Sequence, residues 1–203
     1  MQTGVVILAA GLSSRMGRFK PLLPLGGTTM IEQVVATFRS VGVAHIWVVI
    51  GHRAAQLTEL LDRQAVRWIL NPRYQEEMFT SLQAGVRCLD PGLRAFFILP
   101  VDIPLVRPET LRRLLRAFDP DHIHMLRPCY RGGRGHPPLL SSALIPSIAD
   151  FEGSGGLRAL IERDRLCTQD LECNDPGVLI DMDTRQDYEK HISQNSIRKG
   201  GQN

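Results

Sequence analysis

Short apolar runs rich in β-branched and aromatic residues alternate with helix-patterned segments along the first half of the chain. The runs lie at residues 5–8, 45–50, 66–70 and 95–99 and have the length and composition of buried strands. Between them, Thr29 and Glu32 form a capping-box pattern, and residues 108–118 open with proline and place leucines on one helical face. Such alternation is typical of a parallel sheet that is covered on both faces. We therefore predict a three-layer α/β fold.

The second half of the chain has a less regular pattern. We expect strands at 122–127, 166–171 and 178–180, a Gly-rich turn at 131–135, helices at 143–150 and 155–163, and a last helix that begins at Thr184. No segment has the composition of a linker between independent domains. The sequence predicts one domain over residues 1–193 and a polar tail over residues 194–203.

Composition excludes several classes of protein. Of the 203 residues, 43% are hydrophobic and 22% are charged, which predicts a packed core, and the net charge of +3 gives no reason to expect nucleic acid or an anionic membrane as a partner. The four cysteines form no CxxC pair, so neither a zinc cage nor a disulfide framework is indicated and a cytoplasmic location is expected. The longest apolar run, residues 5–12, is shorter than the roughly 18 residues of a membrane helix, and no Lys or Arg precedes it as in a signal peptide.

A loop of small and basic residues follows the first predicted strand at residues 8–20. Small side chains let a ligand lie against the backbone, and free N–H groups in such a loop form an anion-binding nest. Arg15 and Lys20 add full positive charges, and Lys20 is the only lysine before Lys190. Binding of a phosphate and an ordinary strand-to-helix turn with solvated basic side chains are both compatible with this spacing.

Two familiar phosphate loops are excluded. A P-loop has four residues between its glycines and Ser or Thr directly after its lysine. Here five residues separate Gly11 from Gly17, and Pro21 follows Lys20. The dinucleotide pattern GxGxxG is absent as well.

Two acidic segments follow predicted strands. Asp102 lies between two prolines after the strand at 95–99, where ligands bind in open α/β sheets, and it is either a Mg²⁺ ligand or a turn residue. Asp181 and Asp183 are two apart, so in an extended segment both carboxylates face one side. Asp183 alternatively serves only the dipole of the helix that begins at Thr184.

Two further polar residues are candidates for ligand contact. Thr80 and Gln83 form a second capping-box pattern, which places Ser81 in the first turn of a helix with its hydroxyl free; a plain capped helix explains the same pattern. His136 lies in a rigid Gly-His-Pro-Pro turn, where contact with a substrate and a structural role are both open.

In this order, six motifs resemble the molybdopterin nucleotidyltransferases, and among them the molybdenum cofactor cytidylyltransferase group. They are LAAGLSSRMGRFK at 8–20, SLQAG at 81–85, LPVDIP at 99–104, GRGHPP at 133–138, GGLR at 155–158 and DMDT at 181–184. The match covers about residues 5–191. Two positions depart from the pattern: Glu77 stands where relatives usually have Gly, and Arg185 where Pro is usual.

The resemblance implies a Rossmann-like nucleotidyltransferase fold, with the nucleotide bound in the first half and the acceptor in the second. The implied nucleotide-binding residues are Leu8, Ala9, Ala10, Gly11, Arg15, Lys20 and Ser81. Asp102 and Asp183 would bind Mg²⁺, and Lys20, Arg15 and Asp102 would be catalytic. Arg134, His136, Gly156 and Arg158 would face the acceptor. Ala10 is implied to go with cytidine, whereas Gly at that place goes with guanosine.

The implied reaction is transfer of CMP from CTP to a phosphorylated small molecule, the molybdopterin form of molybdenum cofactor, with release of pyrophosphate. An apo-molybdoenzyme that receives the product is the implied protein partner. Two alternatives remain: a non-catalytic protein that delivers a nucleotide-bearing cofactor, and a sugar-1-phosphate nucleotidyltransferase.

Overall fold

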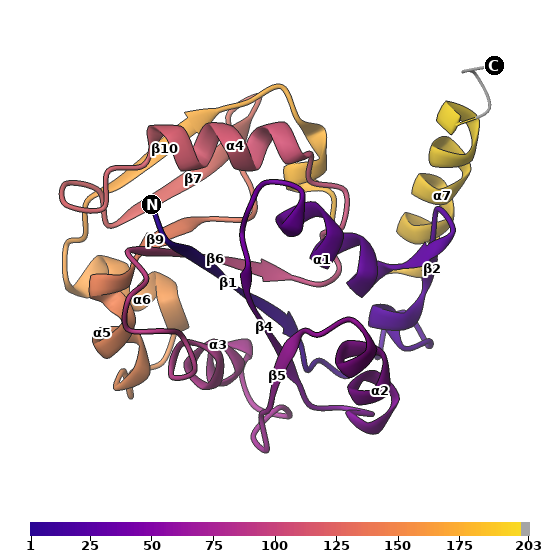
Figure 1. The fold of residues 1–203 in the computed structure, drawn as a ribbon, viewed down its shortest axis with the longest axis horizontal. Coiled ribbons are helices and arrows are strands. Elements are labelled where there is room, and N and C mark those ends of the chain that lie inside the picture. The colour runs from indigo at the N-terminus through magenta and orange to yellow at the C-terminus, as the bar shows by residue number, and fades with distance from the viewer. Residues whose placement is uncertain (200–203) are drawn as a thin grey trace.

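One twisted mixed sheet forms the centre of the molecule (Figure 1). The computed structural model describes residues 1–199, with side chains placed up to residue 192. The strand order is β10-β7-β9-β6-β1-β4-β5, and β8 pairs with β7 beside this path. The strands are β1 (Thr3–Ala9), β4 (His45–Ile50), β5 (Arg67–Leu70), β6 (Ala95–Pro100), β7 (Met125–Tyr130), β8 (Gly133–Arg134), β9 (Leu139–Ser141) and β10 (Thr168–Glu172). A small antiparallel pair, β2 (Pro24–Leu25) and β3 (Thr28–Thr29), lies apart from this sheet.

The pairing is parallel across the half of the sheet that the sequence predicted best. Strand β1 pairs in parallel with both β4 and β6, and β4 pairs in parallel with β5. The short strand β9 runs antiparallel to both β6 and β7, so the sheet is mostly rather than wholly parallel. The four predicted strands of the first half are confirmed, and their carboxyl ends meet at one edge.

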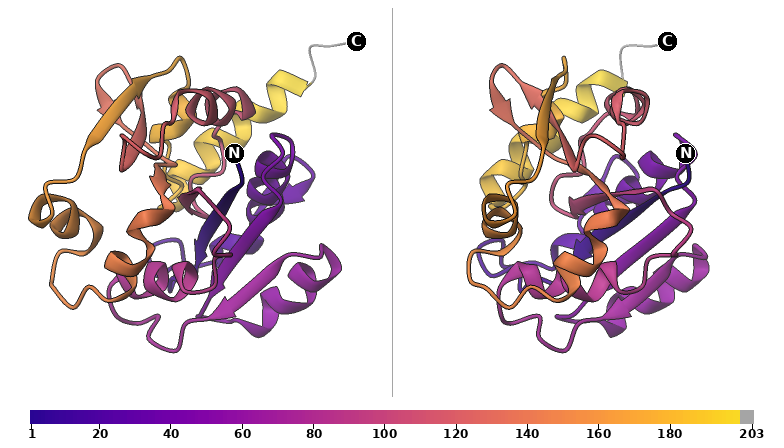
Figure 2. Two further views of the ribbon diagram at one scale, coloured as in Figure 1. Left: turned by 60° about the vertical axis from the view of Figure 1, so that its left-hand side comes forward. Right: turned by 90° about the vertical axis from the view of Figure 1, so that its left-hand side faces the viewer.

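Helices cover both faces of the sheet, as the rotated views in Figure 2 show. Alternate residues of β1 serve opposite faces: Val5 and Ile7 belong to one core, and Val6 and Leu8 belong to the other. The first core is closed by α1 (Met30–Arg39), α2 (Ala55–Arg63) and α4 (Pro108–Ala117), and the second by α3 (Met78–Val86), α5 (Ile145–Ala149) and α6 (Gly156–Arg163). The predicted three-layer α/β fold is therefore confirmed.

Capping boxes begin both the first and the last helix. The Thr29 side chain accepts a hydrogen bond from the backbone of Glu32, whose carboxylate accepts one in return. Thr184 and Asp187 form the same arrangement ahead of α7 (Arg185–Lys199), which lies beside β2 (Figure 1). Helix α7 thus includes residues 194–199 of the segment that we expected to be a tail, and residues 200–203 lie outside the described residues.

Three local expectations are wrong. Residues 176–179 form a 3-10 turn, η3 (Pro176–Leu179), rather than a strand, because Pro176 opens a turn that the Asp175 side chain caps at the Gly177 backbone. The strand predicted at 122–127 begins only at Met125. Thr80 and Gln83 do not form a capping box, because α3 already begins at Met78.

The two remaining short helical segments are η1 (Lys20–Leu22) and η2 (Ser142–Leu144). Within the part of the chain that the structure describes, no helix has both the length and the apolar composition needed to span a bilayer.

Candidate active site

A cleft of about 530 Å³ opens at the edge of the sheet where β1 and β6 end. Three stretches far apart in the sequence line it: the loop after β1, the turn after β6, and the segment that precedes α7. The start of α3 and the preceding loop close one side. All seven residues expected to bind the nucleotide line this cleft: Leu8, Ala9, Ala10, Gly11, Arg15, Lys20 and Ser81. The position agrees with the rule that ligands of open α/β sheets bind at the carboxyl ends of strands.

The loop after β1 is shaped by a tight turn at Ser13. Its carbonyl oxygen accepts hydrogen bonds from the backbone N–H groups of Met16 and Gly17, both at 3.2 Å. Ser13 (φ 53°) and Gly17 (φ 66°) both have left-handed backbone conformations. A Cβ atom added at Gly11 would meet no heavy atom within 4 Å, so the backbone there faces open space. A ligand can therefore approach this part of the main chain closely.

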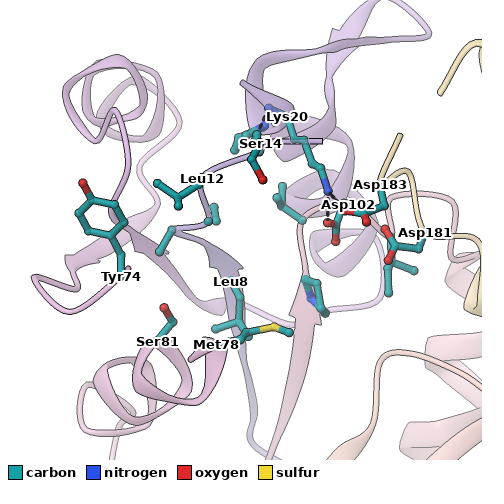
Figure 3. A pocket seen from close by; sticks show the side chains of 18 of the residues that line it. Leu8, Leu12, Ser14, Lys20, Tyr74, Met78, Ser81, Asp102, Asp181 and Asp183 are labelled. Carbon is teal, nitrogen blue, oxygen red and sulfur yellow. Dashed lines mark hydrogen bonds and ion pairs between the residues drawn. The ribbon is translucent and has the colours of Figure 1, made fainter. Parts of the chain in front are cut away.

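Lys20 lies at the centre of an acidic cluster in the cleft (Figure 3). Its ammonium nitrogen Nζ is 2.8 Å from Asp102 Oδ2 and 2.5 Å from Asp183 Oδ1. The Lys20 side chain is only 8% exposed, whereas Asp183 is 30% exposed and also pairs with Arg15. Arg15 and Lys20, which the resemblance implied to bind phosphates, are thus paired with carboxylates in this cleft.

The segment 181–183 is anchored by the residue between its two carboxylates. Met182 is fully buried, and its backbone N–H donates to the carbonyl oxygen of Asp102 at 2.8 Å. Asp181 and Asp183 flank this anchor, so their side chains reach the same cleft as Asp102. One carboxylate oxygen from each of Asp102, Asp181 and Asp183 lies within 4.8 Å of the others. As predicted from their spacing, Asp181 and Asp183 both reach the site. Asp181 therefore lies close to Asp102 and Asp183, the two predicted metal ligands.

The pKa values of the two carboxylates Asp181 and Asp183 shift in opposite directions. Burial lowers the pKa of Lys20, but hydrogen bonds from its ammonium to Asp102 and Asp183 outweigh this, and its pKa is raised. The hydrogen bond from Lys20 lowers the pKa of Asp183. Among the described residues no side chain donates a hydrogen bond to Asp181, and burial together with the charge of Asp102 raises its pKa to about 6. The charge of Lys20 opposes this rise only in part.

This donor set suits a hard divalent cation. Carboxylate oxygens are the protein ligands that Mg²⁺ prefers, and one or two of them with phosphate oxygens are enough. The three close carboxylates meet that requirement, and the raised pKa of Asp181 shows where added positive charge would be stabilised. A divalent ion at this place would compete with Lys20 for the oxygens of Asp102 and Asp183.

A family model described as a MobA-like NTP transferase domain matches residues 5–169. The chain belongs to this family. Its fold is that of a nucleotidyltransferase: a nucleotidyl transferase from Methanothermobacter superposes with a TM-score of 0.81 at 28% identity, over 95% of this chain and 97% of that one. The resemblance seen in the six motifs is thereby confirmed for the family.

Curated relatives of this MobA-like chain carry different names. The nicotine blue oxidoreductase of Paenarthrobacter nicotinovorans is 28% identical over 192 residues, 88% of this chain and 91% of that protein. The bifunctional protein GlmU of Azotobacter vinelandii is 38% identical over 130 residues, 62% of this chain. That match spans only 28% of GlmU, so the chain is similar to less than a third of that relative.

The residues expected to face the acceptor are not brought together. His136 lines the cleft; among the residues that the structure describes, its buried Nδ1 atom has no hydrogen-bond partner, and burial lowers the pKa of its ring. Arg134 lies on β8 and pairs with Asp170, and Arg158 pairs with Glu162 on the exposed face of α6. Gly156 begins α6 beside Phe79. Of these four, only His136 lines the cleft.

The sequence interpretation missed the wall of the cleft opposite the acidic cluster. Tyr74, Leu12 and Met78 line that wall together with Ser81 (Figure 3), and Met78 is 62% exposed. The exposure of Met78 and its position at the cleft follow only from the fold, so the sequence alone did not reveal them. Glu77, flagged as a departure from the family pattern, precedes α3 but lines a neighbouring hollow instead.

Proposed function

We propose that this chain transfers CMP from CTP to the phosphate of the molybdopterin form of molybdenum cofactor, with Mg²⁺ as cofactor and pyrophosphate as the second product. The observation that carries the proposal is the convergence in one cleft of the open Gly11 loop, Lys20 and three carboxylates. A nucleoside triphosphate needs N–H donors and cations for its phosphates, and carboxylates for its metal ion. In this cleft the backbone at Gly11 faces open space, Lys20 provides a cation, and three carboxylates are available for a metal ion.

The reaction itself demands little from protein acids and bases. An oxygen of the acceptor phosphate forms a bond to the α-phosphorus of CTP, while the bond from that phosphorus to the bridging oxygen breaks and pyrophosphate leaves. The nucleophile is a phosphomonoester, which is mostly a dianion at pH 7 because its second pKa is about 6. No side chain has to remove a proton. The task of the protein is to bring several negative charges together in the correct orientation.

Lys20 and Arg15 are the residues that answer this need. Both line the cleft and both carry full positive charge next to the open Gly11 loop. Lys20 and Arg15 both pair with Asp183, which is 30% exposed. The triphosphate can therefore replace this carboxylate as their shared partner. Lys20, held on a buried stem, would bind at a fixed position, whereas the exposed Arg15 would reach for the outer phosphates.

Asp102, Asp181 and Asp183 would hold the divalent ion. When bound, Mg²⁺ neutralises phosphate charge and orients the reacting groups. The role of the chain is to fix these three carboxylates, which it does through the strand end before Asp102 and the buried anchor Met182. Burial and the charge of Asp102 raise the pKa of Asp181 to about 6. A bound cation is expected to keep Asp181 ionised at lower pH, because a nearby positive charge favours the carboxylate.

The preference for a pyrimidine base rests on the wall near Ala10. Ala10 is 3% exposed, and its Cβ atom would lie 2.9 Å from a Cβ added at Gly51. We take the Ala10 methyl to limit the space beside the loop, because Ala10 lines the cleft. Ser81 contributes a hydroxyl group to the same wall.

One assay tests the proposal. Pyrophosphate release is measured with Mg²⁺ and each of CTP, GTP, ATP and UTP, against a molybdopterin-type acceptor and against sugar phosphates. The proposal expects release with CTP and the molybdopterin-type acceptor, and little with the other pairs. No release with any pair, from folded protein, would contradict transferase activity and favour a non-catalytic delivery protein.

A sugar 1-phosphate is the second candidate acceptor, the alternative that the sequence analysis left open for a nucleotidyltransferase. Pyrophosphate release with a sugar phosphate and not with the molybdopterin-type acceptor would select it. An apo-molybdoenzyme would be the receiving partner under the first proposal. Binding of the protein to such an enzyme, with and without product, tests that part separately.

A further inference from the structure

Asn71 is a buried polar residue that lies directly behind the cleft wall. It follows β5 and is only 2% exposed. Its backbone N–H donates to the carbonyl oxygen of Ile50 at 2.9 Å, which holds it at the carboxyl edge of the sheet. Its side chain contacts the start of α3, where its Nδ2 atom is 2.9 Å from Ser81 Oγ and 3.0 Å from Thr80 Oγ1.

The orientation of the Asn71 amide is fixed by its other end. The backbone N–H of Arg73 lies 2.9 Å from Asn71 Oδ1. A backbone N–H can only donate, so the atom that faces Arg73 must be the amide oxygen. The NH₂ group therefore faces the two hydroxyls, and Ser81 Oγ accepts a hydrogen bond from Asn71.

This leaves the hydroxyl hydrogen of Ser81 for a ligand. Among the described residues, Ser81 Oγ has Asn71 as its hydrogen-bond partner and no other. The neighbouring Thr80 hydroxyl differs, because its single hydrogen is already directed to backbone carbonyl oxygens, that of Glu77 at 3.0 Å and that of Arg73 at 3.2 Å. Ser81 lines the cleft, whereas Thr80 lines the adjacent hollow. A serine that accepts from behind and faces a cleft presents a donor to whatever binds there.

We propose that Asn71 is a positioning residue for base recognition: it fixes the Ser81 hydroxyl as a donor to a carbonyl oxygen of the bound base, such as O2 of a pyrimidine. The inference rests on the proposed function, because it assumes that the base of the nucleotide reaches this wall. It also states the direction of the hydrogen bond, in which Ser81 donates and the base accepts. A base that presents an N–H at this place meets a donor and is rejected, while one that presents a carbonyl oxygen is accepted.

The variant Asn71→Asp tests this with almost no change in shape. A carboxylate oxygen replaces the NH₂ group, so Ser81 must donate to residue 71 and presents its lone pairs to the cleft. CTP binding should then weaken about 10–100-fold, because a hydrogen bond is lost and two acceptors face each other. The expected pattern is a raised KM for CTP, with kcat changed by less than a few-fold.

Ribose 5-triphosphate, which lacks a base, is the internal control. Its affinity should fall far less than that of CTP in Asn71→Asp, because the added negative charge acts on both ligands whereas the base contact is lost for CTP alone. Thr80→Val is the matched control variant, because it removes the other hydroxyl that Asn71 contacts and should leave the KM for CTP within about twofold. Adding Asn71→Asp to Ser81→Ala should have little further effect, because the hydroxyl that it reorients is gone.

The outcomes separate the inference from the proposed function. If the wild type releases no pyrophosphate from CTP with any acceptor, the proposed function fails. If it does release pyrophosphate but binds CTP no better than ribose 5-triphosphate, the base does not reach this wall and the inference fails. If the wild type favours CTP and Asn71→Asp keeps that advantage, the inference alone is wrong. Thermal unfolding reports whether Asn71→Asp is folded; if it is not, Asn71→Ala serves, with an expected loss in CTP affinity of about 3–10-fold and none for ribose 5-triphosphate.

Discussion

The ammonium of Lys20 is bonded to the carboxylate of Asp102 at 2.8 Å, although 82 residues separate them in the chain. Lys20 begins the short turn after the Gly11 loop, and Asp102 follows the end of β6. Strands β1 and β6 are parallel neighbours, so the loops that leave their carboxyl ends meet. The sheet thus places the ammonium that we propose to bind phosphate beside a carboxylate that we propose to bind a metal ion.

Asp102→Asn should abolish most of the turnover while the protein stays folded. Loss of a metal ligand should lower kcat by about 10³-fold or more at saturating Mg²⁺, which corresponds to several kcal/mol of transition-state stabilisation. The measurement is steady-state pyrophosphate release, with Asp121→Asn as control, since Asp121 is an exposed carboxylate paired with Arg94. Near wild-type turnover in Asp102→Asn would remove Asp102 from the metal site.

Lys20→Met should lower kcat/KM for CTP far more than Arg18→Met. The Lys20 ammonium is held in the cleft on a side chain that is 8% exposed, whereas Arg18 is exposed and does not line the cleft. We expect at least about a hundredfold loss for Lys20→Met, because a preorganised charge that contacts the transferring phosphates is removed. Equal losses for the two variants would show that the loop supplies only diffuse positive charge.

Patterns local in the sequence predicted most of the fold and part of the site. The capping boxes at Thr29 and Thr184 and the four apolar strands depend on neighbouring residues, and the structure has them all. The position of Asp102 follows from the end of a strand. These features need no knowledge of distant contacts, which is why a single sequence predicts them.

Features that depend on tertiary contacts were missed. The turn at Pro176–Leu179 replaces a predicted strand because a buried side chain, Asp175, caps it. Gln83, expected to cap a helix, instead donates to carbonyl oxygens at the end of α5 and beyond, among them Phe151 O at 2.9 Å. Asn71 is one polar residue after a short strand, and only the fold shows that it faces Ser81.

Stability should depend on pH in opposite ways for two carboxylates of the cluster. The pKa of Asp181 is raised to about 6 in the folded protein, so its ionisation reduces stability as pH rises from about 4 to 6. Asp181→Asn removes this effect and should raise the free energy of unfolding at pH 7.5 by about 1 kcal/mol, because solvent screens this exposed group. At pH 4.5 the gain should be small. Urea unfolding with a metal chelator present measures both values.

Asp183→Asn is the matched control for that prediction, with the opposite sign. Lys20 lowers the pKa of Asp183, so the ionised carboxylate stabilises the folded state above its ordinary pKa, and this stability is lost as pH falls through the lowered value. The variant should therefore be less stable than the wild type at pH 7.5. A gain in stability for Asp183→Asn, or a loss for Asp181→Asn, would contradict the charge balance described for the cluster.

The wild type should prefer CTP over GTP, and Ala10→Gly should raise the use of GTP. Ala10 and Tyr74 line the cleft, and both lie close to Gly51: a Cβ added at Gly51 would be 2.9 Å from Ala10 Cβ and 2.5 Å from Tyr74 Cβ. Removing the Ala10 methyl should reduce packing in this wall and widen the space for a purine. Steric selection of this kind is worth about 1–3 kcal/mol, or roughly 10–200-fold.

The preference for CTP should therefore be clear but incomplete, and the measurement is kcat/KM for both nucleotides with one acceptor. Ala36→Gly is the control, because Ala36 is exposed on α1 and does not line the cleft. A wild type that already prefers GTP would show that Ala10 does not set the base, and the donor at Ser81 would then have to be matched to a carbonyl oxygen of guanine.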